Sequence, residues 1–305
     1  MENKFNYDVI VIGGGPAGLS AALYAGRGCR SVAVLDSALT GGQPSYYTQI
    51  ANYPGYVSID SSGLVRNFAF QAESFGAKFY QNIEIERVHL LAKQKEIYTD
   101  EGTFIAPAVI IATGAHPRYL NVPEEEKFRF KGISYCAVCD GGFYKDKTVA
   151  VLGGGNSACE AALYLSKIAK KVYLIHRRDS FRADEILQRH VKETMNIEII
   201  VNRCVANILG EEKVSGVRLS DHTEINVDGI FPYIGTEPNT ELFKDFPFID
   251  ENNFIKVNTK QETSVIGVFA AGDVTDSPLK QVVTAAADGA KAGTFALRYL
   301  YSVGC

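Results

Sequence analysis

The chain has 305 residues, 46% hydrophobic and 22% charged, and is therefore long enough for two globular domains. Its 28 glycines are typical of a globular fold with many tight turns. The 31 basic and 35 acidic residues leave a formal net charge of −4, without the basic excess that marks proteins that bind nucleic acids. We therefore expect no nucleic-acid partner.

The uncharged stretch from Val9 to Gly26 resembles a signal peptide or a membrane span at first sight. Asp8 stands where a basic flank would be expected, and the run Gly13-Gly14-Gly15-Pro16 would break a membrane helix. A strand that leads into a glycine turn explains the stretch better. We therefore expect no membrane partner and a cytoplasmic location.

A glycine-rich loop follows the first predicted strand. The apolar run from Tyr7 to Ile12 predicts a buried parallel strand, and Leu19 to Ala25 predicts a helix. Between them lies Gly13-Gly14-Gly15-Pro16-Ala17-Gly18. In such a unit Gly13 permits the tight turn. Gly15 lets the backbone approach a pyrophosphate, and Gly18 lets helix and strand pack closely. The start of the helix offers N–H groups to the phosphates.

An acidic residue strengthens this nucleotide site. The next predicted strand runs from Ser31 to Leu35 and ends at Asp36, which lies 23 residues after Gly13. At this position an acid accepts hydrogen bonds from ribose hydroxyls and would repel a 2′-phosphate. The alternative is a glycine turn in an ordinary α/β domain, and Asp36 makes nucleotide binding the favoured interpretation.

Two of the six cysteines are close in sequence. Cys136 and Cys139 are separated by two residues and followed by Asp140. Thiol exchange needs one sulfur that attacks and a second that resolves the mixed disulfide. An adjacent carboxylic acid could protonate a leaving thiolate or accept its proton. In a reducing compartment a structural disulfide framework is not expected, so the pattern favours redox chemistry.

Two other interpretations of the cysteine pair are weaker. A zinc site would need another pair of cysteines or histidines at ligand spacing, and we therefore predict no metal. The five histidines are instead scattered along the chain: His89, His116, His176, His190 and His222. Inert core cysteines are possible, but they would not explain the run Cys-Ala-Val-Cys-Asp-Gly.

A second glycine loop follows the cysteine pair. The strand predicted at Thr148 to Leu152 leads into Gly153-Gly154-Gly155-Asn156-Ser157-Ala158, and a helix is predicted from Ala158 to Lys167. Alanine replaces the third glycine, a variant that the fingerprint allows. The next predicted strand is Val172 to Ile175. The chain thus contains two candidate nucleotide sites.

Basic residues stand where the first site has its acid. His176 lies 23 residues after Gly153, and Arg177, Arg178 and Arg182 follow it. Arginine binds phosphate through paired, charge-assisted hydrogen bonds. The cluster therefore predicts that the second site selects a 2′-phosphate and binds NADPH. A solvated basic patch is the alternative, but the cluster falls at the position that contacts the ribose.

The pattern of strands after each loop also repeats. Three short strands lead into an apolar strand in both halves of the chain. In the first half these are Ile83–Leu91, Glu96–Thr99, Thr103–Ile105 and then Val109–Ala112. In the second half they are Val205–Leu209, Val214–Leu219, Glu224–Val227 and then Gly229–Tyr233. The two halves are therefore predicted to be related units.

The end of the chain is expected to return to the first unit. An apolar strand is predicted at Gly267 to Ala271 and a helix from Gln281 to Tyr299, with no glycine loop of their own. The predicted fold class is α/β, with two Rossmann-like, three-layer ββα nucleotide-binding domains, the second inserted into the first. The first domain should comprise residues 1–116 and 246–305, and the second residues 117–245.

The motifs, in this order and spacing, resemble one known family along essentially the whole chain. The chain is similar to the low-molecular-weight, bacterial-type thioredoxin reductases of the FAD/NADPH pyridine nucleotide-disulfide oxidoreductases. The motifs that carry the resemblance are Gly13 to Gly18, Gly41-Gly42-Gln43, Asn52-Tyr53-Pro54-Gly55, Ala112-Thr113-Gly114, Cys136 to Gly141, Gly153 to Ala158, His176-Arg177-Arg178, Phe181-Arg182-Ala183, Gly235 to Thr240 and Gly272-Asp273-Val274.

The resemblance implies two cofactors, FAD in the first domain and NADPH in the second. It implies that FAD is bound by Gly13, Gly15, Pro16, Ala17, Gly18, Asp36, Gly42, Gln43, Asn52, Thr113, Gly114, Gly272, Asp273, Lys280, Gln281 and Val282. It implies that NADPH is bound by Gly153, Gly155, Asn156, Ser157, His176, Arg177, Arg178 and Arg182.

The resemblance also implies a reaction and its partners. Hydride would pass from NADPH to FAD, and the reduced flavin would open the Cys136–Cys139 disulfide. Cys139 would face the flavin, Cys136 would attack the disulfide of thioredoxin, and Asp140 would act as acid and base. A homodimer is expected.

Some positions depart from the family pattern. Lys280 stands where arginine is usual, and Gly142 stands where many members carry a bulky residue in the thioredoxin-docking pocket. Pro44, Pro232 and Ala287 are also unusual. The terminal Cys305 has no resolving partner in sequence, so we expect an unused thiol.

Two rival functions remain open. One is another flavin enzyme of this architecture, either a dithiol oxidase or a ferredoxin-dependent thioredoxin reductase; Arg177, Arg178 and Arg182 argue against the ferredoxin route. The other is a nucleotide-sensing protein without turnover, against which the intact Cys-x-x-Cys-Asp run argues.

Overall fold

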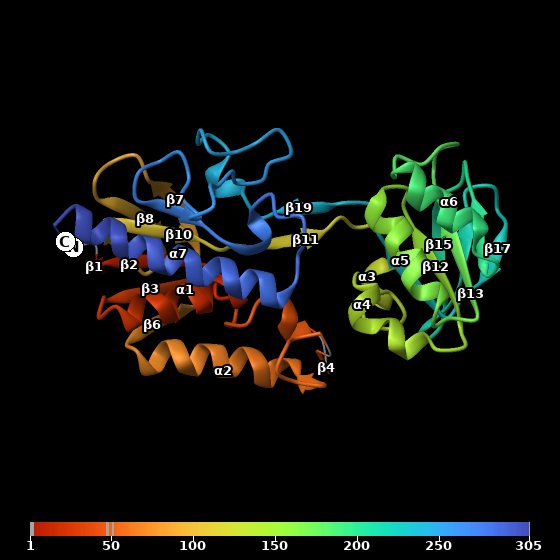
Figure 1. The fold of residues 1–305 in the computed structure, drawn as a ribbon, viewed down its shortest axis with the longest axis horizontal. Coiled ribbons are helices and arrows are strands. Elements are labelled where there is room, and N and C mark those ends of the chain that lie inside the picture. The colour runs from red at the N-terminus through yellow and green to blue at the C-terminus, as the bar shows by residue number, and fades with distance from the viewer. Residues whose placement is uncertain (1–2, 47–48, 51, 305) are drawn as a thin grey trace. The chain divides into compact units, whose positions relative to one another are not determined.

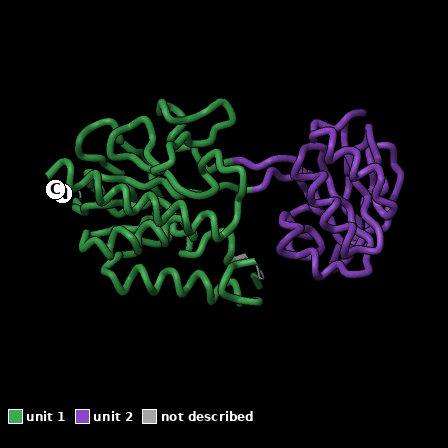
Figure 2. Tube along the Cα trace, viewed as in Figure 1, with its two compact units in different colours: residues 1–116, 238–305 green, residues 117–237 purple. Residues whose placement is uncertain are grey.

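A computed structural model describes residues 3–46, 49–50 and 52–304, and it divides the chain into two compact units. Unit 1 comprises residues 1–116 and 238–305, and unit 2 comprises residues 117–237 (Figure 2). Unit 2 is therefore inserted into unit 1. The two connecting segments pair as strands β11 (Ala115–Pro117) and β19 (Thr236–Pro238).

The second crossing lies at Pro238, whereas the sequence led us to expect it at residue 246. The residues after Pro238 already pack against unit 1. Asn239 donates to the carbonyl oxygen of Thr113 at 2.7 Å, and Thr240 donates to that of Asn253 at 2.9 Å. Phe243 is buried in the core of unit 1. These contacts move the boundary toward the N-terminus.

Unit 1 is built on a parallel sheet of five strands. In spatial order they are β20 (Val268–Ala270), β10 (Ala108–Ile111), β2 (Val9–Ile12), β3 (Val32–Asp36) and β6 (Ala77–Gln81). Both faces of the sheet are covered, which explains why β20, β10 and β2 are continuous apolar runs, whereas β6 at the edge contains polar residues. The α-helices in the described part of this unit are α1 (Pro16–Arg27), α2 (Ser61–Ser74) and α7 (Val282–Ser302) (Figure 1).

Alternate residues of the sheet enter two separate cores. Val9 and Val11 of β2 pack with α1 and α7, while Ile10 and Ile12 pack on the opposite face. That face is covered by a second sheet of four strands, of which Phe104 is the buried centre. Its strands are β1 (Lys4–Asn6), β9 (Gly102–Ala106), β8 (Lys95–Thr99) and β7 (Ile85–His89). The result is the predicted three-layer ββα arrangement.

The second sheet has one strand more than the sequence predicted. β1 pairs in parallel with β9, so that Phe5 lies beside Phe104. Their rings stack with centroids 4.6 Å apart, and Tyr80 contacts the same ring from another side. Three residues are too short to give a strand signal of their own, and the pairing depends on this aromatic contact.

Unit 2 repeats the design with a parallel sheet of four strands. In spatial order they are β14 (Ile197–Ile200), β13 (Lys171–Ile175), β12 (Thr148–Leu152) and β18 (Gly229–Pro232). Val149 and Val151 pack against α5 (Asn156–Ser166), while Ala150 and Leu152 pack against a three-stranded layer. That layer contains β15 (Val205–Gly210), β16 (Val214–Leu219) and β17 (Glu224–Asn226). The repeat predicted from the sequence is therefore present in the fold.

Helices α1 and α7 approach closely because small residues line their contact. A Cβ on Gly289 would clash with the carbonyl oxygen of Ala17, and one on Gly293 would clash with that of Ala21. The side chain of Leu297 likewise occupies the space beside Gly28, where a Cβ would clash with it. The C-terminal helix thus lies directly on the helix that begins at the first glycine loop.

Replacing Gly289 by alanine is expected to destabilise the protein, because the added methyl group would strike α1. Glycine to alanine inside a helix normally gains roughly 1 kcal/mol, so a loss reports the close packing. We expect a loss of about 1–3 kcal/mol, the usual cost of overpacking. Urea unfolding followed by circular dichroism measures this. Ala287→Gln, on an exposed position of the same helix, should stay within about 0.5 kcal/mol. Equal or greater stability of Gly289→Ala would contradict the packing argument.

Candidate active site and nucleotide sites

The glycine loop of unit 1 joins β2 to α1 and leaves open space beside its backbone. Gly13 has a φ of +104°, and a Cβ there would clash with the carbonyl group of Ala112. A Cβ on Gly15 would meet only the Cα of Gly42, at 3.8 Å. A Cβ on Gly18 would clash with the carbonyl oxygen of Gly13, so helix and loop are in direct contact. Gly13 thus permits the turn and Gly18 the close packing of helix on loop, while the backbone at Gly15 leaves room that fits a phosphate.

The first turn of α1 faces a carboxylate at the end of β3. Pro16 and Ala17 begin the helix, and no side chain in the described ranges caps it. Asp36 accepts the N–H of Gly14 at 2.7 Å and that of Ala38 at 3.0 Å. Burial raises the pKa of Asp36, while these two hydrogen bonds lower it. This arrangement fits a nucleotide with phosphates at the helix end and a ribose at Asp36.

Hydrogen bonds join other predicted residues of unit 1 that are distant in sequence. Asn52 Nδ2 donates to Gln281 Oε1 at 2.9 Å. The side-chain amide of Gln43 donates to the carbonyl oxygen of Ala115. Of the remaining predicted residues, Gly42, Thr113 and Gly114 lie in loops, Gly272 begins a short 3-10 helix (Gly272–Val274), and Val282 begins α7.

Asp273 and Lys280 lie in the turn between β20 and α7. Burial raises the pKa of Asp273; the charge of Lys280 opposes this and that of Asp288 adds to it. Lys280 Nζ donates to the carbonyl oxygens of Asp273 and Thr275, at 2.8 and 3.1 Å. The ammonium of Lys280 therefore holds this turn closed. A carboxylate that is costly to ionise fits a ligand whose hydroxyl groups donate to it.

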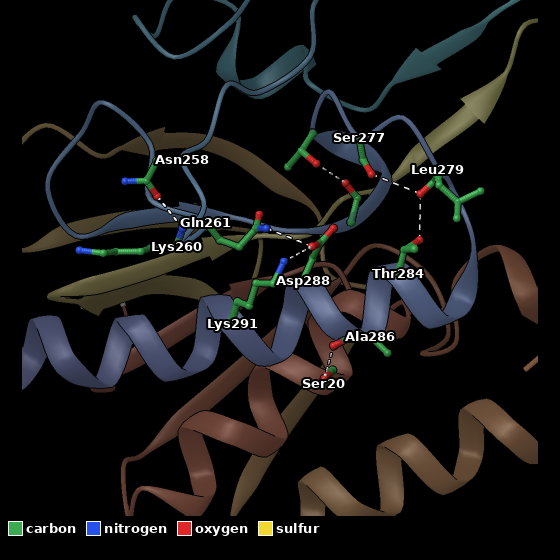
Figure 3. A network of polar contacts seen from close by, with 12 residues as sticks. Ser20, Asn258, Lys260, Gln261, Ser277, Leu279, Thr284, Ala286, Asp288 and Lys291 are labelled. Atoms are coloured by element: carbon green, nitrogen blue, oxygen red, sulfur yellow. Dashed lines mark hydrogen bonds and ion pairs between the residues drawn. The ribbon is translucent and has the colours of Figure 1, made fainter. Parts of the chain in front are cut away.

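A polar network holds the start of α7 beside this turn (Figure 3). Thr284 donates to the carbonyl oxygen of Leu279 at 2.8 Å. Asp288 accepts from Gln261 at 3.0 Å and pairs with Lys291 at 3.4 Å. The segment before β20 is thus fastened to the helix on which Gln281 and Val282 lie.

The glycine loop of unit 2 joins β12 to α5 in the same way. Gly153 has a φ of +145°, and a Cβ there would clash with the carbonyl oxygen of Tyr233. A Cβ on Gly155 would meet nothing within 4 Å. Asn156 and Ser157 are exposed in the first turn, which no described side chain caps. Space and unpaired N–H groups again fit a nucleotide phosphate.

The basic cluster after β13 surrounds a buried histidine. His176 lies against Gly154 and stacks on Phe181, with ring centroids 5.4 Å apart. Burial lowers the pKa of His176, and the nearby charges of Arg177, Arg178 and Arg182 lower it further. Its Nε2 is buried and has no hydrogen-bond partner within the described residues. Arg177, Arg178 and Arg182 are exposed around it. An orphaned buried nitrogen beside three guanidinium groups fits a phosphorylated ribose.

The cysteine pair forms a disulfide at the start of a short helix, α4 (Ala137–Asp140). The Cα atoms of Cys136 and Cys139 lie 5.3 Å apart. The backbone N–H of Cys139 donates to Cys136 Sγ at 3.1 Å. The N–H of Ala137 donates to the hydroxyl of Tyr233 at 2.8 Å. Tyr233 follows β18, so the end of the nucleotide-binding sheet holds the helix that carries the disulfide.

Asp140 is held by a buried serine. Ser134 Oγ lies 2.6 Å from Asp140 Oδ2, and it also accepts the backbone N–H of Cys136 at 3.2 Å. Burial raises the pKa of Asp140, while the hydrogen bond from Ser134 lowers it. A carboxyl group with a raised pKa next to a disulfide is suited to proton transfer.

Ser134 and Tyr233 were not predicted from the sequence. Serine is common and gives no motif two residues before a cysteine. Tyr233 lies 94 residues after Cys139, and only the completed sheet brings its hydroxyl to α4. The available signal was that Tyr233 directly follows the apolar strand Gly229–Pro232.

Comparison with known proteins identifies the family. The model of the pyridine nucleotide-disulphide oxidoreductases matches residues 7–289. The chain belongs to this family. A thioredoxin reductase of Rickettsia prowazekii (strain Madrid E) is 40% identical over 308 residues, covering 97% of this chain and 99% of the relative. A protein of Clostridium pasteurianum, named for its 34.2 kDa mass and the rubredoxin operon, is 39% identical over 98% of this chain and 99% of its own.

A solved structure gives the same result. The crystal structure of thioredoxin reductase from Streptococcus pyogenes MGAS5005 has a TM-score of 0.88 and is 39% identical, covering 97% of this chain and 99% of that chain. These matches confirm the resemblance inferred from the motifs and the predicted α/β fold class. Members of the family are oxidoreductases that use a flavin and a pyridine nucleotide.

Three further expectations concern features of the described residues. None of their helices is long and apolar enough to cross a membrane. No group of three or more histidine, cysteine or acidic side chains among them is arranged to hold a metal ion. The predicted unused thiol, Cys305, lies outside the described residues.

Replacing Ser134 by alanine is expected to raise the pKa of Asp140. The serine stabilises the ionised carboxylate, so its loss favours protonation and moves the titration to higher pH. Carbon-13 NMR of the aspartate carboxyl groups across pH measures this. Ser166→Ala, which removes a hydroxyl bonded to Leu163 in α5, should leave Asp140 unchanged. A pKa that stays the same or falls in Ser134→Ala would show that the serine does not set the acidity of Asp140.

Proposed function

We propose that the protein is an NADPH-dependent thioredoxin-disulfide reductase. The observation that carries this proposal is a disulfide, Cys136–Cys139, next to a carboxyl group of raised pKa in the unit that also contains the basic nucleotide loop. The names of the relatives support thioredoxin as the disulfide substrate. A cytoplasmic, homodimeric enzyme is the form we propose.

We assign FAD to unit 1. The open backbone at Gly15 and the uncapped start of α1 support a pyrophosphate there, and Asp36 supports an unphosphorylated ribose. Asp273 would bind the ribityl chain, and Lys280, Gln281 and Val282 would lie along the flavin. When bound, FAD would take a hydride from NADPH and deliver two electrons to the Cys136–Cys139 disulfide.

We assign NADPH to unit 2. Gly153, Gly155, Asn156 and Ser157 would contact the pyrophosphate through the loop and the start of α5. His176, Arg177, Arg178 and Arg182 would bind the 2′-phosphate. The exposed guanidinium groups supply the positive charge that a 2′-phosphate requires. An acid at the same position, as in unit 1, would repel that phosphate.

We infer that Cys136 is the attacking thiol and Cys139 the resolving one. The N–H of Cys139 already points at Cys136 Sγ, so a thiolate on Cys136 gains a backbone hydrogen bond. Its attack on the disulfide of thioredoxin forms a mixed disulfide and releases one thiolate. Asp140, held by Ser134, would give that thiolate a proton. Cys139 then displaces the second thioredoxin sulfur and restores the Cys136–Cys139 bond.

Replacing Arg177 and Arg178 by alanine is expected to weaken NADPH far more than NADH. Each charge-assisted hydrogen bond to the 2′-phosphate is worth about 1.5–3 kcal/mol, or roughly tenfold to a hundredfold in affinity. Steady-state KM values for both coenzymes measure the difference. Arg189→Ala, on the exposed surface of helix α6 (Glu185–Glu193), should leave the ratio unchanged. Equal losses for NADPH and NADH would refute the 2′-phosphate assignment.

An anaerobic titration tests the function as a whole. NADPH should bleach the visible flavin band of the purified protein, and oxidised thioredoxin should restore it, because electrons leave through Cys136. In Cys136→Ser, NADPH should still bleach the band but thioredoxin should no longer restore it. Bleaching without recovery in the parent protein would remove thioredoxin as the substrate. No bleaching by NADPH or NADH would point to another electron donor or to a dithiol oxidase.

A further inference from the structure

An aspartate at the start of α6 hydrogen-bonds to the first residue of α5 and not to its own helix. Asp184 is the N-cap residue of this helix, a position where aspartate usually accepts a backbone N–H of its own helix. Here its carboxylate makes no such bond within the described residues. Instead, Asn156 Nδ2 donates to Asp184 Oδ2 at 2.9 Å, and the backbone N–H of Asp184 donates to Asn156 Oδ1 at 2.8 Å. The pair is reciprocal and joins α6 to the glycine loop.

The residues before Asp184 are fastened to the same loop. The backbone N–H groups of Arg182 and Ala183 both donate to the carbonyl oxygen of Gly154, at 2.7 and 3.2 Å. Gln188, one turn into α6, donates to the carbonyl oxygen of Ala183 at 2.7 Å. The backbone of residues 182–184 is therefore fixed beside the first turn of α5. Among these hydrogen bonds, the one accepted by the Asp184 carboxylate is the one that involves a side chain of residues 182–184, which we call the Arg182 segment.

Fixing this backbone matters because of what Arg182 has to bind. A guanidinium group recognises phosphate through a planar fork, so its geometry depends on where its backbone is held. The long arginine side chain is exposed and is not restrained by packing. Displacement of the segment by about 1 Å would separate the fork from its ligand, while the glycine loop itself would remain intact.

We propose that Asp184 is a positioning residue for coenzyme selectivity: by its reciprocal pairing with Asn156, it holds the Arg182 segment where a 2′-phosphate is bound. The proposal rests on the NADPH assignment of unit 2. Asp184 itself carries a negative charge, which would oppose phosphate binding. Its contribution to selectivity must therefore come from the hydrogen bonds and not from its charge.

Two substitutions separate these effects. D184N and D184S remove the same charge, but only asparagine keeps a carbonyl oxygen in reach of Asn156 Nδ2. Serine is itself a preferred N-cap residue, so D184S preserves the start of α6. D184T serves in its place if D184S does not fold. D179S makes the matched change at Asp179, an exposed acid of the same loop whose side chain accepts a hydrogen bond from its neighbour Ser180.

The experiment measures the affinity of the flavin-loaded protein for NADP⁺ and for NAD⁺ by isothermal titration calorimetry. We expect D184S to lose roughly tenfold or more in NADP⁺ affinity, with NAD⁺ affinity unchanged. D184N and D179S should keep the parent preference or increase it, because each removes a charge that repels phosphate.

Three results would overturn the proposal. If D184S keeps the parent preference for NADP⁺, Asp184 does not position the site, and the NADPH assignment stands. If D184S weakens NADP⁺ and NAD⁺ equally, Asp184 supports the loop without setting selectivity. If the parent protein itself binds both coenzymes equally, the NADPH assignment and this inference fail together.

Discussion

The feature on which the two nucleotide sites depend is a helix start left without a side-chain cap. Both α1 and α5 begin directly at a glycine loop, with N–H groups that no described side chain satisfies. Such ends are normally capped, so both helices lack the stability that a cap would add. Their N–H groups stay available for the phosphates of the cofactors that we propose. Close packing offsets the missing caps: Gly18 touches the loop, and α7 lies on α1 through Gly289 and Gly293. The core therefore supports helix ends that do not stabilise themselves.

The disulfide is built on the same scaffold. α4 has only four residues and could not hold its own geometry in isolation. Tyr233, directly after the sheet strand β18, binds its first N–H group, and the carbonyl oxygen of the same tyrosine lies against Gly153. One residue thus borders both the nucleotide loop and the redox helix. Ser134 supplies the remaining support by joining Asp140 to the backbone of Cys136.

The sequence predicted those parts of the fold that have strong local signals. Glycine loops, continuous apolar strands and the ribose-position residues Asp36 and His176 all follow from residue type and spacing. Several elements were not predicted, among them β1, α2, β6, α6 and β14. β1 depends on an aromatic contact with Phe104, and the mixed polarity of α2 gives a weak helical pattern. In the site, Ser134, Tyr233 and Asp184 escaped prediction because their roles depend on partners that only the folded chain brings near.

The two units share a contact between the middle glycine of the loop and a side chain at the end of the next strand, but that side chain is acidic in unit 1 and an imidazole in unit 2. In unit 1 the carboxylate of Asp36 lies against Gly14 and accepts its N–H at 2.7 Å. In unit 2 the ring of His176 occupies the same place, against Gly154. Asp36 is the last residue of β3, and His176 directly follows β13. Each would clash with a side chain on the middle glycine of its loop. An acid there keeps acceptor sites for a ribose hydroxyl and would repel a phosphate. In the NADPH site that we propose, the imidazole leaves the charge to the surrounding arginines. Exchanging one residue, at a backbone contact that both units share, would then change which ribose the loop accepts.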